Sequence, residues 1–411
     1  MTNQPGLLIL SGGAEAVPGI RRAKCLGFRT IVVDGNASAP GRSISDVFIQ
    51  ASVYHHNEVI DALRPVWASL AVDGVTTVAA DNSLTVARVG EQFGLRAQSV
   101  KTAFLATNKL AMKDALRSAK ISIPWYREIT SLAQLEEQLA RRPGAYVLKP
   151  VDSRGSRGVT RLSTISECGE AYRNARSATL VDQLILEEWL DGDQLSSESL
   201  VWDSRSYLCG LADRNYKRLN QLYPYVVEDG GETPSRFFNT EMVQSVDQLM
   251  DEVCKAIGLT EGSIKGDLVL IDGRLVVIEV ASRLSGGSFS TVTIPLVHRY
   301  DLVGNVFRVA IGQTPTLPPR PLTTFCFQAN RFLFPAPGTV RAIERAPLVN
   351  SNVVDSAICV GVGDRLKSPR DHTLRGGWVL TSGASRIEAV NEAEKFVSAT
   401  RIIVEPDVIP S

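Results

Sequence analysis

The chain has 411 residues, of which 44% are hydrophobic and 21% charged, a composition typical of folded proteins with roughly two to four domains. Its 44 Lys and Arg residues balance 44 Asp and Glu residues, so it lacks the positive excess that a large nucleic-acid-binding surface needs. It contains no apolar stretch of the ~18 residues that span a membrane, no signal-peptide pattern and no C-x-x-C pair. We therefore expect a cytoplasmic protein with neither a membrane nor a nucleic-acid partner.

The first hundred residues alternate between strand and helix patterns. Apolar runs lie at 7–10, 30–33 and 75–79, and a helix pattern covers 18–26. This alternation predicts a doubly wound parallel sheet, in which ligands lie at the carboxyl ends of the strands. Gly12-Gly13, Asp34 and Asp81 fall at those ends, which makes them candidates for the wall of a binding site.

The middle of the chain continues with a helix pattern and several β-rich runs. The helix is predicted at 109–119 and the β-rich runs at 146–150, 184–190, 266–270 and 275–280. Asp272-Gly273 separates the last two runs, and an Asp-Gly pair between β-rich runs is a strong hairpin signal.

A proline-rich stretch at 315–321 reads as a linker to a C-terminal segment of about 90 residues. In that segment we predict strands near 324–330 and 358–362 and a helix near 387–398.

The loop after Lys149 has the composition of a phosphate-binding loop. Residues 153–158 hold two glycines, two serines and two arginines. Glycines let a backbone approach a phosphate closely, and amides and hydroxyls can donate to its oxygens. The loop is not a Walker motif, and a polar turn is the alternative interpretation. Lys149 favours phosphate binding, because a lysine within an apolar run needs an anionic partner.

Asp267 and Glu279 lie on the two arms of the predicted hairpin, about opposite each other. Both interrupt apolar runs, and two facing carboxylates repel each other unless a cation lies between them. Mg²⁺ prefers such hard oxygen ligands together with phosphates. The alternative is a pair of solvent-facing charges on an amphipathic hairpin. Arg283 follows four residues after Glu279, where a cation could stabilise charge during phosphoryl transfer.

In their order along the chain, these motifs resemble the ATP-grasp superfamily. The order is Lys109 before a helix and Ile-Pro, V-L-K-P with its Ser/Arg/Gly loop, E-E-W-L-D-G, and D-x11-E with a nearby Arg. The resemblance implies an α/β ATP-grasp fold with a doubly wound pre-ATP domain, a lid, a nucleotide subdomain and a small C-terminal α+β domain. The implied limits are 1–105 for the pre-ATP domain, 106–314 for the ATP-grasp domain (lid about 110–185) and 322–411 for the closing domain.

The resemblance also implies roles for individual residues. Lys109, Lys149, Ser153, Arg154, Gly155, Ser156 and Gly158 would bind the ATP phosphates, and Glu187, Glu188, Trp189 and Leu190 would form the adenine hinge. Asp267 and Glu279 would hold Mg²⁺, or Mn²⁺ in its place, and Arg283 would be the catalytic arginine near the acyl phosphate. Many family members have Asn two residues after the second metal carboxylate. Here that residue is Ala281, which puts a second magnesium ion in doubt.

Within the superfamily, the sequence is most similar to L-amino-acid ligases and related carboxylate–amine ligases. The substrate-side segment would contribute Asp213, Lys217 and Glu228, and the glycine-rich stretch Arg283, Gly286 and Gly287. The expected reaction is ATP-dependent C–N bond formation of the acid–amino-acid ligase type, through an acyl phosphate, with ADP and phosphate released. The expected partners are a small carboxylate and an amine, and a homodimer is the family expectation. The alternatives are a purine-biosynthetic or carboxyphosphate-forming ATP-grasp enzyme and a non-catalytic nucleotide-binding regulator.

Overall fold

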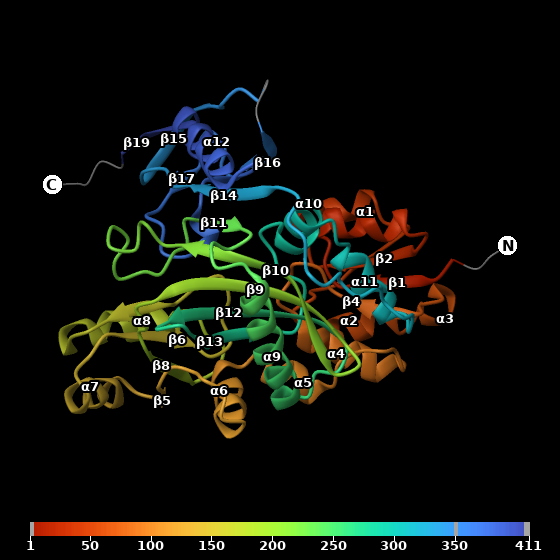
Figure 1. Ribbon diagram of the computed structural model, residues 1–411, viewed down its shortest axis with the longest axis horizontal. Helices are drawn as coiled ribbons and strands as arrows, with labels where there is room; N and C mark the ends of the chain where they lie inside the picture. Colours follow the sequence, from red (N-terminus) through yellow and green to blue (C-terminus); the bar gives the residue numbers. More distant parts are fainter. Residues whose placement is uncertain (1–3, 349–351, 407–411) are drawn as a thin grey trace.

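The computed structural model describes residues 4–348 and 352–406, so the outer domain limits expected at residues 1 and 411 lie outside the described residues. The N-terminal region is a parallel sheet with strand order β3-β2-β1-β4 (Figure 1). Its strands are β1 (Gly6–Ile9), β2 (Arg29–Asp34), β3 (Val47–Gln50) and β4 (Gly74–Thr76). Successive residues of β1 enter different cores, because strand side chains alternate between faces: Leu7 and Ile9 join one core, Leu8 the other.

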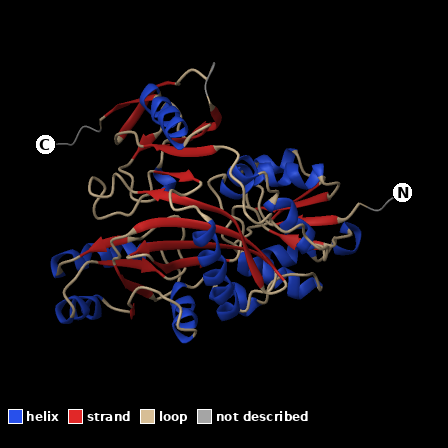
Figure 2. Ribbon diagram, in the orientation of Figure 1, coloured by secondary structure: helices blue, strands red, loops and turns tan. Residues whose placement is uncertain are grey.

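Helices cover both faces of this sheet, which confirms the doubly wound prediction. The two helices on one face are α1 (Val17–Cys25) and α11 (Leu302–Ala310); on the other are α2 (His56–Leu63) and α4 (Ser83–Phe93), with the short α3 (Trp67–Leu70) nearby. Because α11 packs against both α1 and β4, the chain returns to its first sheet after about 300 residues. Figure 2 shows helices gathered around this sheet and long strands through the middle of the molecule.

A four-stranded antiparallel sheet follows, which we call the lid sheet. Its order is β5-β8-β6-β7, from β5 (Tyr126–Ile129), β6 (Tyr146–Pro150), β7 (Thr160–Leu162) and β8 (Leu184–Glu188). Helices α7 (Leu132–Arg141) and α8 (Cys168–Ser177) pack on it, and α5 (Val100–Leu105) and α6 (Lys109–Ser118) lead into it. The predicted helix at 109 begins as expected, since the Asn108 side chain caps it by accepting a hydrogen bond from the Ala111 amide (3.0 Å).

The centre of the molecule is an antiparallel sheet of eight strands in the order β13-β12-β9-β10-β11-β14-β18-β16. The first five are β9 (Asp193–Trp202), β10 (Arg205–Asn215), β11 (Gly230–Thr233), β12 (Gly262–Ile271) and β13 (Arg274–Ala281). Helix α9 (Thr240–Ile257) packs on β10, and the short α10 (Ile294–His298) lies beside the same strand. The predicted hairpin is present: Asp272 and Gly273 both have positive φ, as its two-residue turn requires.

The C-terminal segment extends this central sheet with β14 (Phe327–Leu333), β16 (Val353–Ile358) and β18 (Gly377–Gly383). The proline-rich stretch at 315–321 therefore joins two parts of one sheet. A small sheet follows, from β15 (Gly338–Glu344), β17 (Arg365–Leu366) and β19 (Arg401–Glu405), and α12 (Arg386–Ala399) packs on β14 and β18.

One predicted strand in this segment was wrong, because β16 ends where the strand at 358–362 was expected to begin. The residues that follow form a turn in which Gly363 adopts a φ of 95°. Across the ranges that the structure describes, no helix is long and apolar enough to cross a membrane.

Candidate active site

A cavity of about 1040 Å³ lies where the parallel sheet, the lid sheet and the central sheet meet. Each region contributes to its wall: Asp81 follows β4, Lys149 lies on β6, Asp267 on β12 and Trp378 on β18. The cavity thus collects residues from the carboxyl ends of the parallel strands, as the doubly wound pattern predicts.

Most of the site residues expected from the sequence line this one cavity. They are Lys109, Lys149, Ser153, Arg154, Gly155, Ser156, Glu187, Glu188, Trp189, Leu190, Asp213, Glu228, Asp267, Glu279, Arg283, Gly286 and Gly287. Gly158 and Lys217 are not among the lining residues. Lys217 is exposed and faces Glu394 of α12 at 3.7 Å, so the structure does not bring it to the site.

Asp267 and Glu279 are direct neighbours across the β12–β13 ladder. Each carboxylate has cationic neighbours: Lys265 Nζ lies 2.9 Å from Asp267, Arg214 lies 3.1 Å from it, and Lys109 lies 3.2 Å from Glu279. Burial alone raises the pKa of Asp267, but Arg214 and Lys265 outweigh burial and hold it well below the ordinary value. Asp267 is therefore ionised at neutral pH, as a metal ligand must be.

These two carboxylates fit a magnesium ion. Lys265 Nζ lies 2.9 Å from each oxygen of Asp267, but its hydrogen bond goes to Oδ2, and Oδ1 is buried without a donor. Over the described parts of the chain, no group of three or more His, Cys, Asp or Glu side chains is placed to hold a metal. An ion here would complete its shell with phosphate oxygens and water, as Mg²⁺ commonly does.

Lys149 has the anionic partner that its apolar strand demands. Glu187 on β8 is buried, and its Oε2 lies 3.1 Å from Lys149 Nζ and 3.3 Å from Lys113 Nζ. Burial alone raises the pKa of Glu187, but the two ammonium groups outweigh it and lower the pKa. Burial lowers the pKa of Lys113 to about 8, although Glu187 opposes this shift. One carboxylate on the lid sheet thus holds two lysines, Lys149 on the cavity wall and Lys113 on α6.

The loop that follows Lys149 is fixed from both sides. Arg154 donates to the Asp81 carbonyl (2.7 Å) and lies 3.8 Å from the centre of the Tyr54 ring, both in the N-terminal region. On the other side, Ser156 Oγ lies 3.1 Å from Nε2 of His372, whose amide donates to the Gly155 carbonyl (3.0 Å). In this closed arrangement the loop forms part of the cavity wall.

Gly158 lies at the end of the loop, where only a residue without a side chain fits. Its φ is 74°, and a Cβ added there would lie 2.7 Å from Ala178 Cβ and 2.8 Å from Pro150 Cγ. Its structural contribution is the close packing of the loop end against the lid.

Arg283 is held in the cavity by Asp81. Its Nε donates to Asp81 Oδ1 at 2.7 Å, and its Nη2 lies 2.5 Å from the same oxygen. Burial alone lowers the pKa of Arg283, but Asp81 outweighs it and raises the pKa, so the guanidinium stays charged. Asp81, which follows strand β4 of the parallel sheet, therefore orients an arginine that follows the β12–β13 hairpin.

In the hinge expected to bind adenine, two backbone amides are used within the protein. The Glu188 amide donates to the Trp125 carbonyl and the Trp189 amide to the Ala145 carbonyl, both at 2.9 Å. Arg161 lies 4.3 Å from the centre of the Trp189 ring. An adenine edge bound here has to use other backbone groups of the hinge.

The substrate-side residues are engaged in ion pairs and hydrogen bonds. Glu228 lies 3.0 Å from Arg214, and Asp213 is buried against Arg386 of α12. The Gly287 amide donates to Glu15 Oε2 at 3.0 Å, which ties the glycine-rich stretch to the N-terminal region.

Sequence reasoning missed five charged or titratable residues that matter here: Lys113, Arg214, Lys265, His372 and Arg375. Lys113 could have been found, since it follows Lys109 by four residues and so shares its helix face. Lys265 precedes Asp267 by two residues and lies on the same face of β12. His372 and Arg375 carry no local signal, because they reach the cavity from the far end of the chain.

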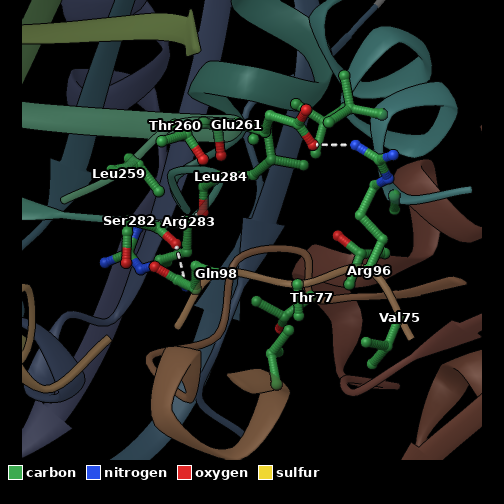
Figure 3. Close-up of a pocket in the computed structure, with 18 residues that line it drawn as sticks. Val75, Thr77, Arg96, Gln98, Leu259, Thr260, Glu261, Ser282, Arg283 and Leu284 are labelled. Atoms are coloured by element: carbon green, nitrogen blue, oxygen red, sulfur yellow. Dashed lines mark hydrogen bonds and ion pairs between the residues drawn. The ribbon is translucent and has the colours of Figure 1, made fainter. Parts of the chain in front are cut away.

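A second, smaller cavity of about 100 Å³ lies behind Arg283 (Figure 3). The Arg96–Glu261 ion pair (2.6 Å) forms part of its lining. Gln98, which also lines it, donates a hydrogen bond to the Ser282 carbonyl (3.2 Å). This cavity borders the strand end that positions Arg283.

Comparisons with known protein families agree with this geometry. Residues 106–287 match the ATP-grasp domain, and residues 331–405 match the L-amino acid ligase C-terminal domain 2. Residues 106–287 therefore form a domain similar to the ATP-grasp family. The resemblance inferred from the motifs is thereby confirmed, and so is the α/β ATP-grasp fold.

Similar proteins cover most of the chain. The L-amino acid ligase from Bacillus licheniformis superposes with a TM-score of 0.82 at 19% identity, over 98% of this chain and 100% of that one. The biotin carboxylase domain of the Hydrogenobacter thermophilus 2-oxoglutarate carboxylase, solved with MgADP and bicarbonate, gives 0.73 at 16% identity, over 97% and 90%. The uncharacterized protein y4rH of Sinorhizobium fredii is 25% identical over 348 residues, which are 82% of this chain and 70% of that protein.

Proposed function

We propose that this ATP-grasp protein is an ATP-dependent carboxylate–amine ligase that forms an amide or peptide bond through an acyl phosphate. One observation carries the proposal: the Asp267–Glu279 pair, the Lys149–Glu187 pair, the loop at 153–156 and Arg283 all border one cavity. The match of residues 331–405 to an L-amino acid ligase domain supports the ligase over other ATP-grasp reactions.

Different residues of the cavity would bind ATP and assist the phosphoryl transfer. Lys109, Lys149 and the loop at 153–156 hold the phosphates of ATP. Asp267 and Glu279 would hold magnesium, which would offset the negative charge of the phosphates. A substrate carboxylate oxygen attacks the γ-phosphorus, and ADP leaves. Arg283 stabilises the transferring phosphoryl group.

The second half of the reaction forms the C–N bond. The amine nitrogen attacks the acyl carbon, the C–O bond to phosphate breaks, and the nitrogen loses a proton. The closed loop at 153–158 excludes water, which would otherwise hydrolyse the acyl phosphate.

The purine-biosynthetic alternative receives less support from the cavity. It needs a sugar-phosphate site near Gly12-Gly13, yet the Gly12 amide donates to Asp34 (2.8 Å), and Glu15 also lines this wall. Carboxylates at that place disfavour a phosphate. A non-catalytic regulator is disfavoured because the metal carboxylates and Arg283 are together in the cavity.

Several expectations from the sequence remain proposals. They are the domain limits 1–105, 106–314 and 322–411, the use of Mg²⁺ or Mn²⁺ with ATP, small-molecule substrates, a homodimer and a cytoplasmic location. The residue roles carried over from the family, from Lys109 to Arg283, also have this status.

The test is ADP release with Mg²⁺ and pooled amino acids and small carboxylic acids, with mass spectrometry of the products. We expect ADP only with an acid–amine pair, and a product lighter than the pair by one water. Glu279→Gln should abolish ADP formation, because it removes a charged metal ligand. Glu241→Gln, on the exposed first turn of α9, is the matched control. Full activity of Glu279→Gln would refute the metal assignment, and no ATP binding by the wild type would refute the proposal.

A further inference from the structure

Arg375 is a half-buried cation that lines the main cavity without a carboxylate partner. Its Nη2 donates to the Glu228 carbonyl (2.6 Å), and its guanidinium lies 3.5 Å from the centre of the Phe332 ring. Its Nε is buried and has no hydrogen-bond partner. Among the described residues it forms no ion pair, since the nearby Glu228 carboxylate pairs with Arg214 at 3.0 Å.

The carboxylates nearest Arg375 are already engaged by other cations. Glu228 pairs with Arg214, and Asp267 pairs with Arg214 and Lys265, while Asp229 acts on Arg375 without forming an ion pair with it. His372 adds no charge to this wall. Burial, together with Arg375, holds the pKa of His372 well below its ordinary value, so the imidazole is neutral at neutral pH. Burial lowers the pKa of Arg375 to about 10, which leaves its guanidinium charged under the same conditions.

A second unsatisfied donor lies on the same wall. Gln328, Asn330 and Phe332 alternate along β14 and all line the cavity, as residues on one face of a strand do. The Gln328 side chain is only 3% exposed, and its Nε2 has no hydrogen-bond partner. Buried donors without acceptors are costly, so two of them beside one cavity indicate that an acceptor belongs there.

We propose that Arg375 and the cavity face of β14 bind an anionic group, a carboxylate or a phosphate, that a substrate carries in addition to the carboxylate that is activated. The subsite deepens the proposed function and rests on it, because it assigns a charge to one substrate of that reaction. Arg375 supplies the charge, and Phe332 holds the guanidinium plane. The anionic group belongs to the acyl donor or to the amine acceptor, and the experiment separates the two.

The experiment compares matched substrates that differ by one anionic group. Butyrate is paired with succinate as donors, and ethylamine with glycine and with phosphoethanolamine as acceptors, within the panel that identifies activity. Hydroxylamine traps the acyl phosphate as a hydroxamate, so this readout depends on the donor alone. We expect the wild type to prefer the more anionic member on one side, and Arg375→Gln to reduce that preference by roughly 10- to 100-fold. The less anionic member should react equally well with both proteins.

Arg370→Gln is the matched control, because Arg370 lies in the same segment, is exposed and stacks on Tyr225 outside the cavity. A preference that Arg375→Gln leaves unchanged, or an equal loss for both members of each pair, would overturn the subsite. Calorimetric titration with succinate and butyrate, and with glycine, phosphoethanolamine and ethylamine, tests it without turnover. A wild type that binds none of the anionic members more tightly than Arg375→Gln does refutes the subsite. If no acid causes ADP release but the wild type binds succinate more tightly than Arg375→Gln does, the result counts against the proposed ligase activity. The anion subsite is then still supported.

Discussion

Glu187→Gln tests whether one buried carboxylate holds the lid's two lysines. Glu187 lies 3.1 Å from Lys149 and 3.3 Å from Lys113, and Lys113 is completely buried. Glutamine keeps the shape of the side chain but removes its charge. Two ammonium groups would then be buried between the lid sheet and the central sheet without the Glu187 carboxylate, and breaking a buried pair in this way costs ~3–5 kcal/mol.

The structure also divides this cost between the lysines. The difference between the ordinary pKa of Lys113, 10.5, and its value of about 8 corresponds to ~3 kcal/mol against its charged form. Lys113 can also become neutral by losing its proton. For a lysine with the ordinary pKa of 10.5, deprotonation at neutral pH costs ~5 kcal/mol, and this sets the upper limit of the penalty for burying Lys113. Removing Glu187 therefore adds at most ~2 kcal/mol through Lys113, and the remainder must act through Lys149.

Hydrogen exchange of the β6 and β8 amides measures the free energy of opening in this part of the molecule. Glu188→Gln is the control on the same strand, because Glu188 is 41% exposed and pairs with Arg142 at 3.3 Å, a surface pair of ~0–1 kcal/mol. We expect Glu187→Gln to lower the opening free energy by ~3–5 kcal/mol. A loss no larger than that of Glu188→Gln would refute the reasoning.

Two further predictions concern the lid. Lys113 has a folded-state pKa of about 8, below its ordinary value of 10.5, so the unfolded chain binds more protons between these pH values and this residue's contribution to stability rises with pH. Lys113→Met should remove that rise, ~3 kcal/mol, which urea unfolding of both proteins across the window would detect; parallel pH curves would contradict it. Gly158→Ala should lower stability by ~1–3 kcal/mol, since a Cβ meets Ala178 and Pro150 at a positive φ. At Gly155, φ is also positive but a Cβ meets nothing closer than 4.0 Å, so an equal loss of melting temperature in Gly155→Ala would exclude the clash.

Local sequence patterns predicted those parts of the site that are formed by residues close together in the sequence. The strand predicted at 146–150 coincides with β6, and its five residues are all buried. The Asp272-Gly273 turn placed Asp267 and Glu279 about opposite each other, but the turn alone would pair Asp267 with Ile278. An irregularity in the ladder between Asp267 and Leu268 shifts the register by one residue, so that Asp267 faces Glu279.

The substrate side was less predictable, because its residues depend on distant partners. Asp213 and Lys217 are only four residues apart, yet β10 ends at Asn215. Asp213 remains in the ladder and lines the cavity, whereas Lys217 lies beyond the strand and is exposed. A charge pattern alone does not show where a strand ends.

The closure of the cavity could not be read from any local motif. His372 meets Ser156 across 216 residues of sequence, and Arg375 donates to the carbonyl of Glu228 across 147. Both contacts exist because β14 pairs with β11 and so extends the central sheet with C-terminal strands. Strand pairing at that separation is set by the packing of the whole chain. His372 and Arg375 lie between β17 and β18, so the order of motifs in the middle of the chain could not place them at the cavity.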